Sequence, residues 1–273
     1  MIVLNMNSID SFPEFLDEEL PGIIRKIAIA YNIQPFINDP DFLEERLKKW
    51  HQFGVLSHTK KVRQVFLSEL DNFLKQWDIF EEIQKNLNEE IDGTKKKKLF
   101  EMSIPLHDLG KIPVYGDEKT NREHEFYSKI LLSENLLKQK LSSLELSEKQ
   151  KEYLEKCIET HDVVGKEIRD LLKHEENLNL SFLSTQKVVN LCKSLAAKYQ
   201  DIKTEIGIYF LCDSLGKTDI RLTALTDEEI VKKEQEILEL LEQRKLPQEL
   251  KFAVMQLPAN IKLAEIYLKS LNR

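Results

Sequence analysis

The stretch SIPLHDLGKIPVYGDEKTNREHEFYSK, residues 103–129, marks the point where a strongly helical pattern breaks. Residues 94–108 carry apolar side chains at helical spacing, whereas residues 111–122 lose that periodicity and are rich in polar and turn-forming residues. The adjacent pair His107-Asp108 stands at the break, and His124 opens the next helical pattern. A helix that ends just before Gly110 allows the backbone to bend, so that the neighbouring imidazole and carboxylate can serve one site.

Composition favours an all-α protein. The chain has 273 residues, of which 41% are hydrophobic and 32% charged, and it contains only eight glycines and eight prolines. Few helix breakers combined with many Lys, Glu and Leu residues indicate helices around a real apolar core. The length fits one large domain or two small ones.

Helical periodicity runs along the chain, and we find no strong strand pattern and no internal repeat. We expect a kink or break at Pro21 and at Pro258, and a cap at Ser147. Asp39 or Asp41 is available as the cap of the second helix. The helices are expected over residues 13–33, 39–54, 57–77, 78–90, 94–108, 123–137, 146–162, 183–200, 202–219, 226–245 and 248–271.

Charge and cysteine content restrict the class of partner. The net charge of −7 argues against a broad electrostatic grip on duplex DNA, and the basic run at residues 94–98 is interpreted as a solvated helix start. Cys157, Cys192 and Cys212 each lie in an apolar helical pattern, which predicts buried free thiols and a reducing, cytoplasmic location. No apolar run approaches the roughly 18 residues of a membrane span, and the N-terminus lacks the features of a signal peptide.

Several ionisable side chains occupy faces that should be apolar. His161 closes a stripe of apolar residues, and Asp213 closes another that contains Ile206 and Phe210. A buried unpaired carboxylate costs several kcal/mol, so we expect a cation to meet Asp213. Each residue alone is compatible with a hydrogen-bonded core position, whereas His51 and His174 are interpreted as surface or structural. The candidates at helix ends or inner faces, in five segments, are His58, His107, Asp108, His124, His161 and Asp213.

In this order the residues resemble those of the HD-domain phosphohydrolases. LHDLGK at residues 106–111 is similar to the signature of that superfamily, and HEFYS at 124–128 resembles its next motif. THDVVG at 160–165 and CDSLGKTD at 212–219 resemble further family positions. The similarity covers about residues 57–219 and is nearest to the HD domain fused to bacterial tRNA nucleotidyltransferases and to related nucleases and cyclic phosphodiesterases. His58 precedes His107 by 49 residues, a longer gap than is common, and Glu123 replaces the usual glycine.

The resemblance implies an HD-type helical bundle with two divalent metal ions, for which Mn, Fe, Ni, Co, Zn and Mg are the candidates. His58, His107, Asp108 and Asp213 would hold the first ion. Asp108 would bridge to a second ion held by His124 and His161, and the pair would clamp a phosphate and activate a water. Asp108 and Lys111 would be the catalytic residues, with Lys111 also binding phosphate. Arg122 and Lys217 are further candidates for substrate binding.

The expected function is that of a metal-dependent phosphohydrolase or phosphodiesterase. A small nucleotide, a cyclic nucleotide or a short RNA end is the expected substrate. A mixed-valent di-iron oxygenase and a catalytically silent regulatory module remain alternatives. Residues 46–221 are expected to form the catalytic core. Residues 1–45 and 222–273 are expected to add helices to it, as candidates for a lid or a homodimer face.

Overall fold

The computed structural model describes residues 11–115, 124–169, 183–222 and 226–271. Helices dominate these residues, which contain one small two-stranded ladder, so the all-α class is confirmed. The chain groups into two compact units. The first consists of residues 1–42, 54–63 and 85–161, and the second of residues 43–53, 64–84 and 162–273. The division expected from the sequence, at residues 45 and 221, stays a prediction.

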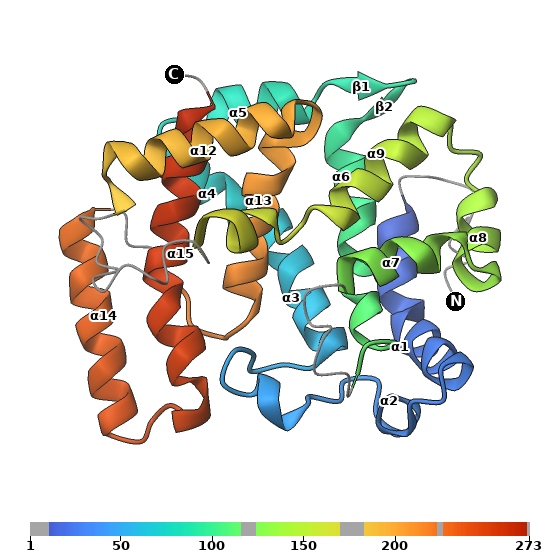
Figure 1. Cartoon of the computed structure of the whole chain (residues 1–273), viewed down its shortest axis with the longest axis horizontal. Coiled ribbons are helices and arrows are strands. Elements are labelled where there is room, and N and C mark those ends of the chain that lie inside the picture. The colour runs from blue at the N-terminus through green and yellow to red at the C-terminus, as the bar shows by residue number, and fades with distance from the viewer. Residues whose placement is uncertain (1–10, 116–123, 170–182, 223–225, 272–273) are drawn as a thin grey trace. The chain divides into compact units, whose positions relative to one another are not determined.

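In the first unit, helices contact the two short 3₁₀ turns that lie on either side of His107 and Asp108. Helix α6, Lys96–Ser103, lies beside α9, Glu148–Glu159 (Figure 1). Helix α7, His124–Ser133, packs on α9 and on the 3₁₀ turn η4, Leu109–Lys111. The other elements are α1 Phe12–Ala30, α2 Gln34–Asn38, the start of α3 Val55–Ser68, β1 Glu90–Ile91, β2 Thr94–Lys95, η3 Ile104–Leu106 and α8 Asn135–Ser142.

The second unit is built on α13, Lys203–Gly216, in which every residue from Thr204 onward is buried. Helix α15, Lys251–Ser270, packs along α13, and it also contacts α12, Gln186–Lys198, and α14, Asp227–Glu242 (Figure 1). The other elements are η2 Glu45–Leu47, the end of α3, α4 Leu70–Gln76, most of α5 Phe80–Leu87, the π-turn η5 Gly165–Arg169, η6 Gln200–Ile202 and η7 Gln248–Leu250.

Neither interior proline ends its helix. Helix α1 continues through Pro21 and α15 continues through Pro258, so the breaks considered from the sequence are absent. An interior proline costs about 3 kcal/mol. In α1 this cost is exceeded by the burial of four large side chains, each worth about 1.5–3 kcal/mol. These side chains are Leu20, Ile23, Ile24 and Ile27, none more than 2% exposed.

Residues 90–95 form a hairpin, where only helices and loops were expected. Glu90 pairs with Lys95 and Ile91 with Thr94, and the two-residue turn between them is Asp92-Gly93. Both turn residues have positive φ, 47° and 86°. A two-residue hairpin turn of this kind requires positive φ at both positions, and Asp-Gly is one of the preferred pairs for it. The expected helix over residues 78–90 therefore ends earlier, at Leu87. The N-terminus of α9 holds this turn, because the amide of Gln150 donates to the carbonyl of Ile91 over 2.9 Å.

The prediction of a helix over residues 39–54 is wrong. Only η2 is helical there, because tertiary hydrogen bonds fix the segment in another shape. Within the second unit, the backbone N–H of Ala253 donates to the carbonyl of Lys49 over 2.9 Å, and the N–H of Gln52 donates to the carbonyl of Lys217 over 2.8 Å. Residues 43–53 therefore form a strap tied to α15 at one point and to the end of α13 at another.

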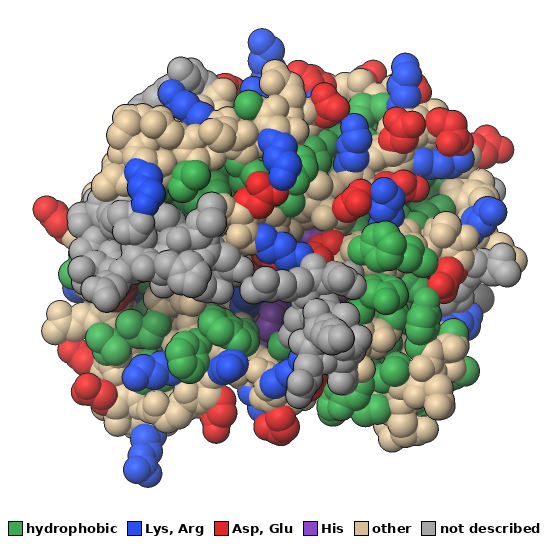
Figure 2. Space-filling model, viewed as in Figure 1, with side chains coloured by type: hydrophobic (Ala, Val, Ile, Leu, Met, Phe, Trp, Pro, Cys, Tyr) green, Lys and Arg blue, Asp and Glu red, His purple; other side chains and the backbone are tan. Residues whose placement is uncertain are grey.

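Other expectations from the sequence are met or refined. Ser147 caps α9 in a capping box with Gln150, as predicted, and the helix expected over residues 57–77 is divided into α3 and α4. All three cysteines are buried free thiols, which confirms that prediction. Among the described helices, none has both the length and the apolar character that crossing a membrane would need. Figure 2 shows basic and acidic side chains interspersed over the visible face.

Candidate metal centre

The start of α3 places His58. Asp41 caps this helix from outside, since its Oδ1 accepts from the backbone N–H of Ser57 over 2.7 Å and its Oδ2 from the Ser57 hydroxyl over 2.6 Å. Asp41 thus caps α3 rather than the helix expected after it. The next residue, His58, is 1% exposed, and its ring faces that of His107 with centroids 5.7 Å apart.

Gly110 connects the turn of the chain at His107 and Asp108, called the corner below, to α7. The N–H of Gly110 donates to the Ser128 hydroxyl over 2.8 Å, and that hydroxyl donates to the carbonyl of His107 over 2.6 Å. A Cβ atom on Gly110 would lie 1.9 Å from the carbonyl oxygen of His124. Only glycine allows this approach, which brings His124, at the first turn of α7, next to the corner.

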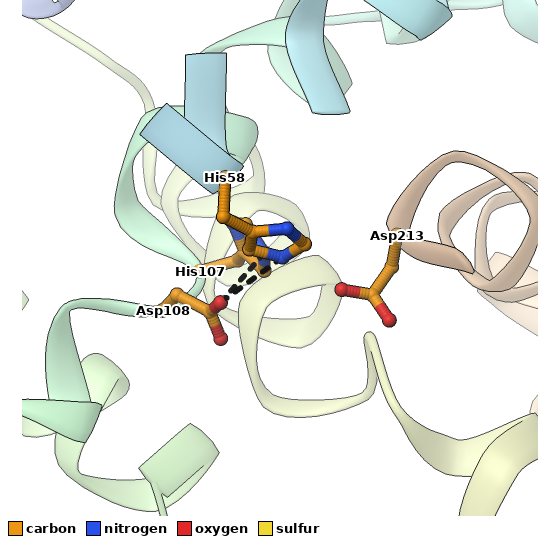
Figure 3. Close-up of side chains that lie close together, drawn as sticks. All are labelled: His58, His107, Asp108 and Asp213. Atoms are coloured by element: carbon orange, nitrogen blue, oxygen red, sulfur yellow. Dashed lines mark ion pairs between the residues drawn. The ribbon is translucent and has the colours of Figure 1, made fainter. Parts of the chain in front are cut away.

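Asp108 lies between two pairs of histidines. Its Oδ2 is 3.3 Å from Nε2 of His58 and 3.4 Å from Nε2 of His107, as Figure 3 shows. Its Oδ1 is 3.1 Å from Nε2 of His124 and 3.6 Å from Nε2 of His161. All five side chains belong to the first unit and are buried. One carboxylate therefore presents a separate oxygen to each pair of imidazoles.

Backbone carbonyls orient two of the four rings. Nδ1 of His107 is 2.6 Å from the carbonyl oxygen of Ile104, and Nδ1 of His161 is 2.7 Å from that of Ile158. With its proton on Nδ1 donated to the carbonyl, each ring points Nε2 toward Asp108. A protonated Nε2 donates to the carboxylate, and a neutral ring offers the Nε2 lone pair to a metal ion. Metal-binding histidines are held in the same way, because a bond from the second nitrogen fixes the tautomer and the ring orientation.

The electrostatics of the cluster favour an ionised Asp108. Burial alone would raise the pKa of Asp108, but His107, Lys111 and hydrogen bonds from His124 and His161 hold that pKa well below its ordinary value. Burial would lower the pKa of His161, and the hydrogen bond to Asp108 with the charge of Glu125 raises it instead. The site thus keeps a buried negative charge that attracts cations.

Two further side chains reach this cluster. The ammonium of Lys111 is 2.6 Å from Oδ2 of Asp108, and its side chain is 18% exposed. Glu125 was not among the predicted site residues, yet it is buried, and its Oε1 lies 3.5 Å from Nδ1 of His124. The sequence held a clue to it, because Glu125, Ser128 and Leu132 share one inward face of α7 at helical spacing.

The donor atoms have the separations that a common metal ion requires. An ion bound at about 2.1 Å keeps its ligand atoms about 3.0 Å apart at octahedral angles and about 3.4 Å apart at tetrahedral angles. Nε2 of His124 and Nε2 of His161 are 3.1 Å apart, and their distances to Oδ1 of Asp108 are 3.1 and 3.6 Å. His58, His107 and Asp108 also offer donor atoms within 4.8 Å of one another. These residues fit a divalent cation in donor type and in spacing.

The structure brings together five of the six predicted ligands in the first unit. The sixth, Asp213, is a buried residue of α13 in the second unit, so its place among the ligands stays a prediction. The cation expected beside it is Lys217, whose Nζ lies 2.7 Å from its Oδ2. Arg122 and His174 lie outside the described residues, and His51 is half-buried in the second unit.

Comparisons with protein-family models, with curated proteins and with solved structures gave no match.

Proposed function

We propose that this chain is a metal-dependent phosphohydrolase or phosphodiesterase of the HD type. One observation carries the proposal: the two oxygens of Asp108 face two separate pairs of buried histidines. Imidazole and carboxylate donors suit Mn, Fe, Ni, Co and Zn, and Mg less well. A carboxylate that can bridge two such ions is the arrangement expected of a site that hydrolyses phosphate esters.

Each of the two proposed ions would have its own set of ligands. His58 and His107 with Oδ2 of Asp108 would hold one cation, and His124 and His161 with Oδ1 would hold the other. Asp213 is proposed as a further ligand of the first. Bound divalent cations would supply Lewis acidity and lower the pKa of a coordinated water toward neutrality. The buried imidazoles and the carboxylate keep the donor atoms fixed, so little reorganisation is needed when a substrate binds.

Lys111 is the proposed phosphate-binding residue. Its ammonium reaches Asp108, and its partly exposed side chain can also present that charge toward solvent. A flexible ammonium in this position can bind a phosphoryl oxygen and stabilise the charge that develops on it during hydrolysis. Lys217 and Arg122 are proposed as weaker phosphate contacts. The proposed substrate is a small nucleotide, a cyclic nucleotide or a short nucleic-acid end.

The test compares Asp108→Asn with Glu101→Gln. Both change a buried carboxylate of the first unit to an amide, but Glu101 pairs with Arg63 and lies outside the cluster. Protein purified without chelator would be analysed for metal and assayed on p-nitrophenyl phosphate, bis(p-nitrophenyl) phosphate, nucleotides and cyclic nucleotides. The proposal requires a loss of turnover of at least about 100-fold for Asp108→Asn and near wild-type turnover for Glu101→Gln.

The same assay separates the alternatives. Turnover that is unchanged in Asp108→Asn contradicts the proposal. Activity that requires dioxygen and reduced iron assigns the cluster to oxygenase chemistry instead. Metal binding without turnover on any of these substrates would favour a regulatory module.

A further inference from the structure

An aromatic pair lies on the surface of the second unit. The rings of Trp50 and Phe252 are 5.6 Å apart between centroids and inclined by 40°. Phe252 is 55% exposed and Trp50 is half-buried. Large aromatic side chains in contact with each other and with water are a common feature of binding surfaces. The two residues are distant in sequence, so the pair exists only because the strap of residues 43–53 packs against the start of α15.

Hydrogen bonds on both sides of Trp50 fix the position of the strap. On one side of Trp50, the carbonyl of Lys49 accepts the backbone N–H of Ala253, the residue after Phe252. On the other side, Gln52 binds the carbonyl of Lys217 through its backbone, and its side-chain oxygen accepts the N–H of Asp219 over 2.9 Å. Rings on a fixed backbone lose little entropy when a flat ligand stacks on them.

Cations flank the rings. Nζ of Lys49 lies 5.9 Å from the centroid of the Trp50 ring, and Lys251, next to Phe252, is exposed. Neither Lys49 nor Lys251 forms an ion pair with any residue that the structure describes. Both charges are therefore available to an anionic ligand that also covers the aromatic pair.

We propose that Trp50 and Phe252, with Lys49 and Lys251, bind single-stranded nucleic acid by base stacking. Every nucleobase has a flat face, so stacking on an exposed aromatic side chain does not depend on sequence, and nearby lysines neutralise the phosphates. A protein partner could cover the rings as well, but it would not need two lysines beside them. Few phosphate contacts also agree with the net charge of −7.

The position of Lys217 connects this surface with the proposed substrate. The backbone N–H of Gln52 donates to the carbonyl of Lys217. Trp50 precedes Gln52 by two residues, which span at most about 7 Å, so the backbone of Trp50 lies close to that of Lys217. Lys217 would bind a phosphate near the strand end while a neighbouring base stacks on Trp50. This step rests on the proposed function, and it narrows the substrate to the end of a short single strand.

The test uses the two tryptophans of the chain. Trp77 is 2% exposed, so a ligand that stacks on the surface should quench the fluorescence of Trp50 alone. Wild-type protein would be titrated with an oligothymidylate of about ten nucleotides while its intrinsic fluorescence is recorded. We expect saturable quenching, and we expect Trp50→Phe to abolish the change in signal.

Phe252→Ala should weaken binding of the oligothymidylate by about 10-fold, because one stacking surface is lost. The matched control is Phe126→Ala, since Phe126 is also 55% exposed but lies in the first unit, on α7. Three phosphate contacts, from Lys49, Lys251 and Lys217, predict that the logarithm of the binding constant falls with the logarithm of salt at a slope of about −2.1. Removing two of these charges in Lys49→Gln with Lys251→Gln should reduce the slope to about −0.7.

Three results would overturn the inference. The first is an absence of quenching, and the second is equal loss of binding in Phe252→Ala and Phe126→Ala. The third is self-association that buries Trp50 in the absence of nucleic acid, detected by sedimentation. Hydrolysis of p-nitrophenyl phosphate by the wild-type protein is measured in parallel. Binding of the oligonucleotide without any hydrolysis removes the proposed function alone, whereas hydrolysis without binding removes this inference alone.

Discussion

Gly110→Ala tests how tightly the metal centre depends on the packing beneath it. A methyl group at residue 110 would meet the carbonyl oxygen of His124 at 1.9 Å and the backbone nitrogen of Ser128 at 2.5 Å. Ordinary contacts of this kind begin at 3.4 Å, so the first turn of α7 must move away by the difference, about 1.5 Å. Such overpacking typically costs about 1–3 kcal/mol of stability.

That movement would separate the donor atoms. Nε2 of His124 starts 3.1 Å from Oδ1 of Asp108 and 3.1 Å from Nε2 of His161. A displacement of about 1.5 Å exceeds the tolerance of metal–ligand geometry, which is about 0.2 Å. We expect binding of Zn²⁺ or Mn²⁺ at the His124–His161 pair to weaken at least about 10-fold, a loss of the size seen when ligand-orienting contacts are removed.

The assay is metal titration by calorimetry, with thermal unfolding of the metal-free protein recorded alongside. The matched control is Gly22→Ala in α1, where a Cβ atom would meet nothing within 4 Å. That substitution replaces a helix-interior glycine and should stabilise the protein by up to about 1 kcal/mol without changing metal binding. A Gly110→Ala protein with wild-type stability and wild-type metal affinity would show that the metal centre does not depend on this packing.

Further predictions concern the first unit. Arg63 pairs with Glu14, Asp17 and Glu101, so Arg63→Met should lower the free energy of unfolding by about 2–4 kcal/mol in urea denaturation, and a change below 0.5 kcal/mol would contradict this. Gly93→Ala forces a side chain onto a φ of 86° and should cost about 1 kcal/mol by the same measurement; equal stability would contradict it. The raised pKa of His161 implies a stabilisation that is complete below about pH 6.5 and is lost as pH rises through the folded-state pKa. Chelated wild-type protein should therefore lose more stability than His161→Gln between about pH 6 and pH 8, and parallel curves would contradict this.

The helical segments with a clear inward face were predictable from sequence. The stripe that ends at His161 and the break at His107-Asp108 both depend on local spacing, and the structure has them where the spacing indicates. The Asp92-Gly93 pair is also a local signal, for a tight hairpin turn, and it follows the helix expected over residues 78–90 with one residue between them. Glu125 was available on the inward face of α7 for the same reason.

The rest depends on contacts between distant residues. The strap of residues 43–53 has a helical pattern, but hydrogen bonds to Lys217 and Ala253 override that propensity. The Trp50–Phe252 pair has no sequence signal, since its members come from separate segments. The distribution of histidines over the two oxygens of Asp108 depends on side-chain rotamers, which spacing along a helix does not determine.

The most direct test of the metal centre is the metal-to-protein ratio of wild type and of the double variant His124→Ala with His161→Ala. The protein would be loaded with Mn²⁺ or Zn²⁺ near pH 7.5, and unbound metal would be removed by gel filtration. The metal content would then be measured by elemental mass spectrometry. We expect about two ions per chain for wild type and about one for the double variant. An unchanged ratio with weaker phosphate binding would contradict the two-ion site and leave the two histidines as phosphate contacts, and a wild-type ratio near zero would contradict the metal centre itself.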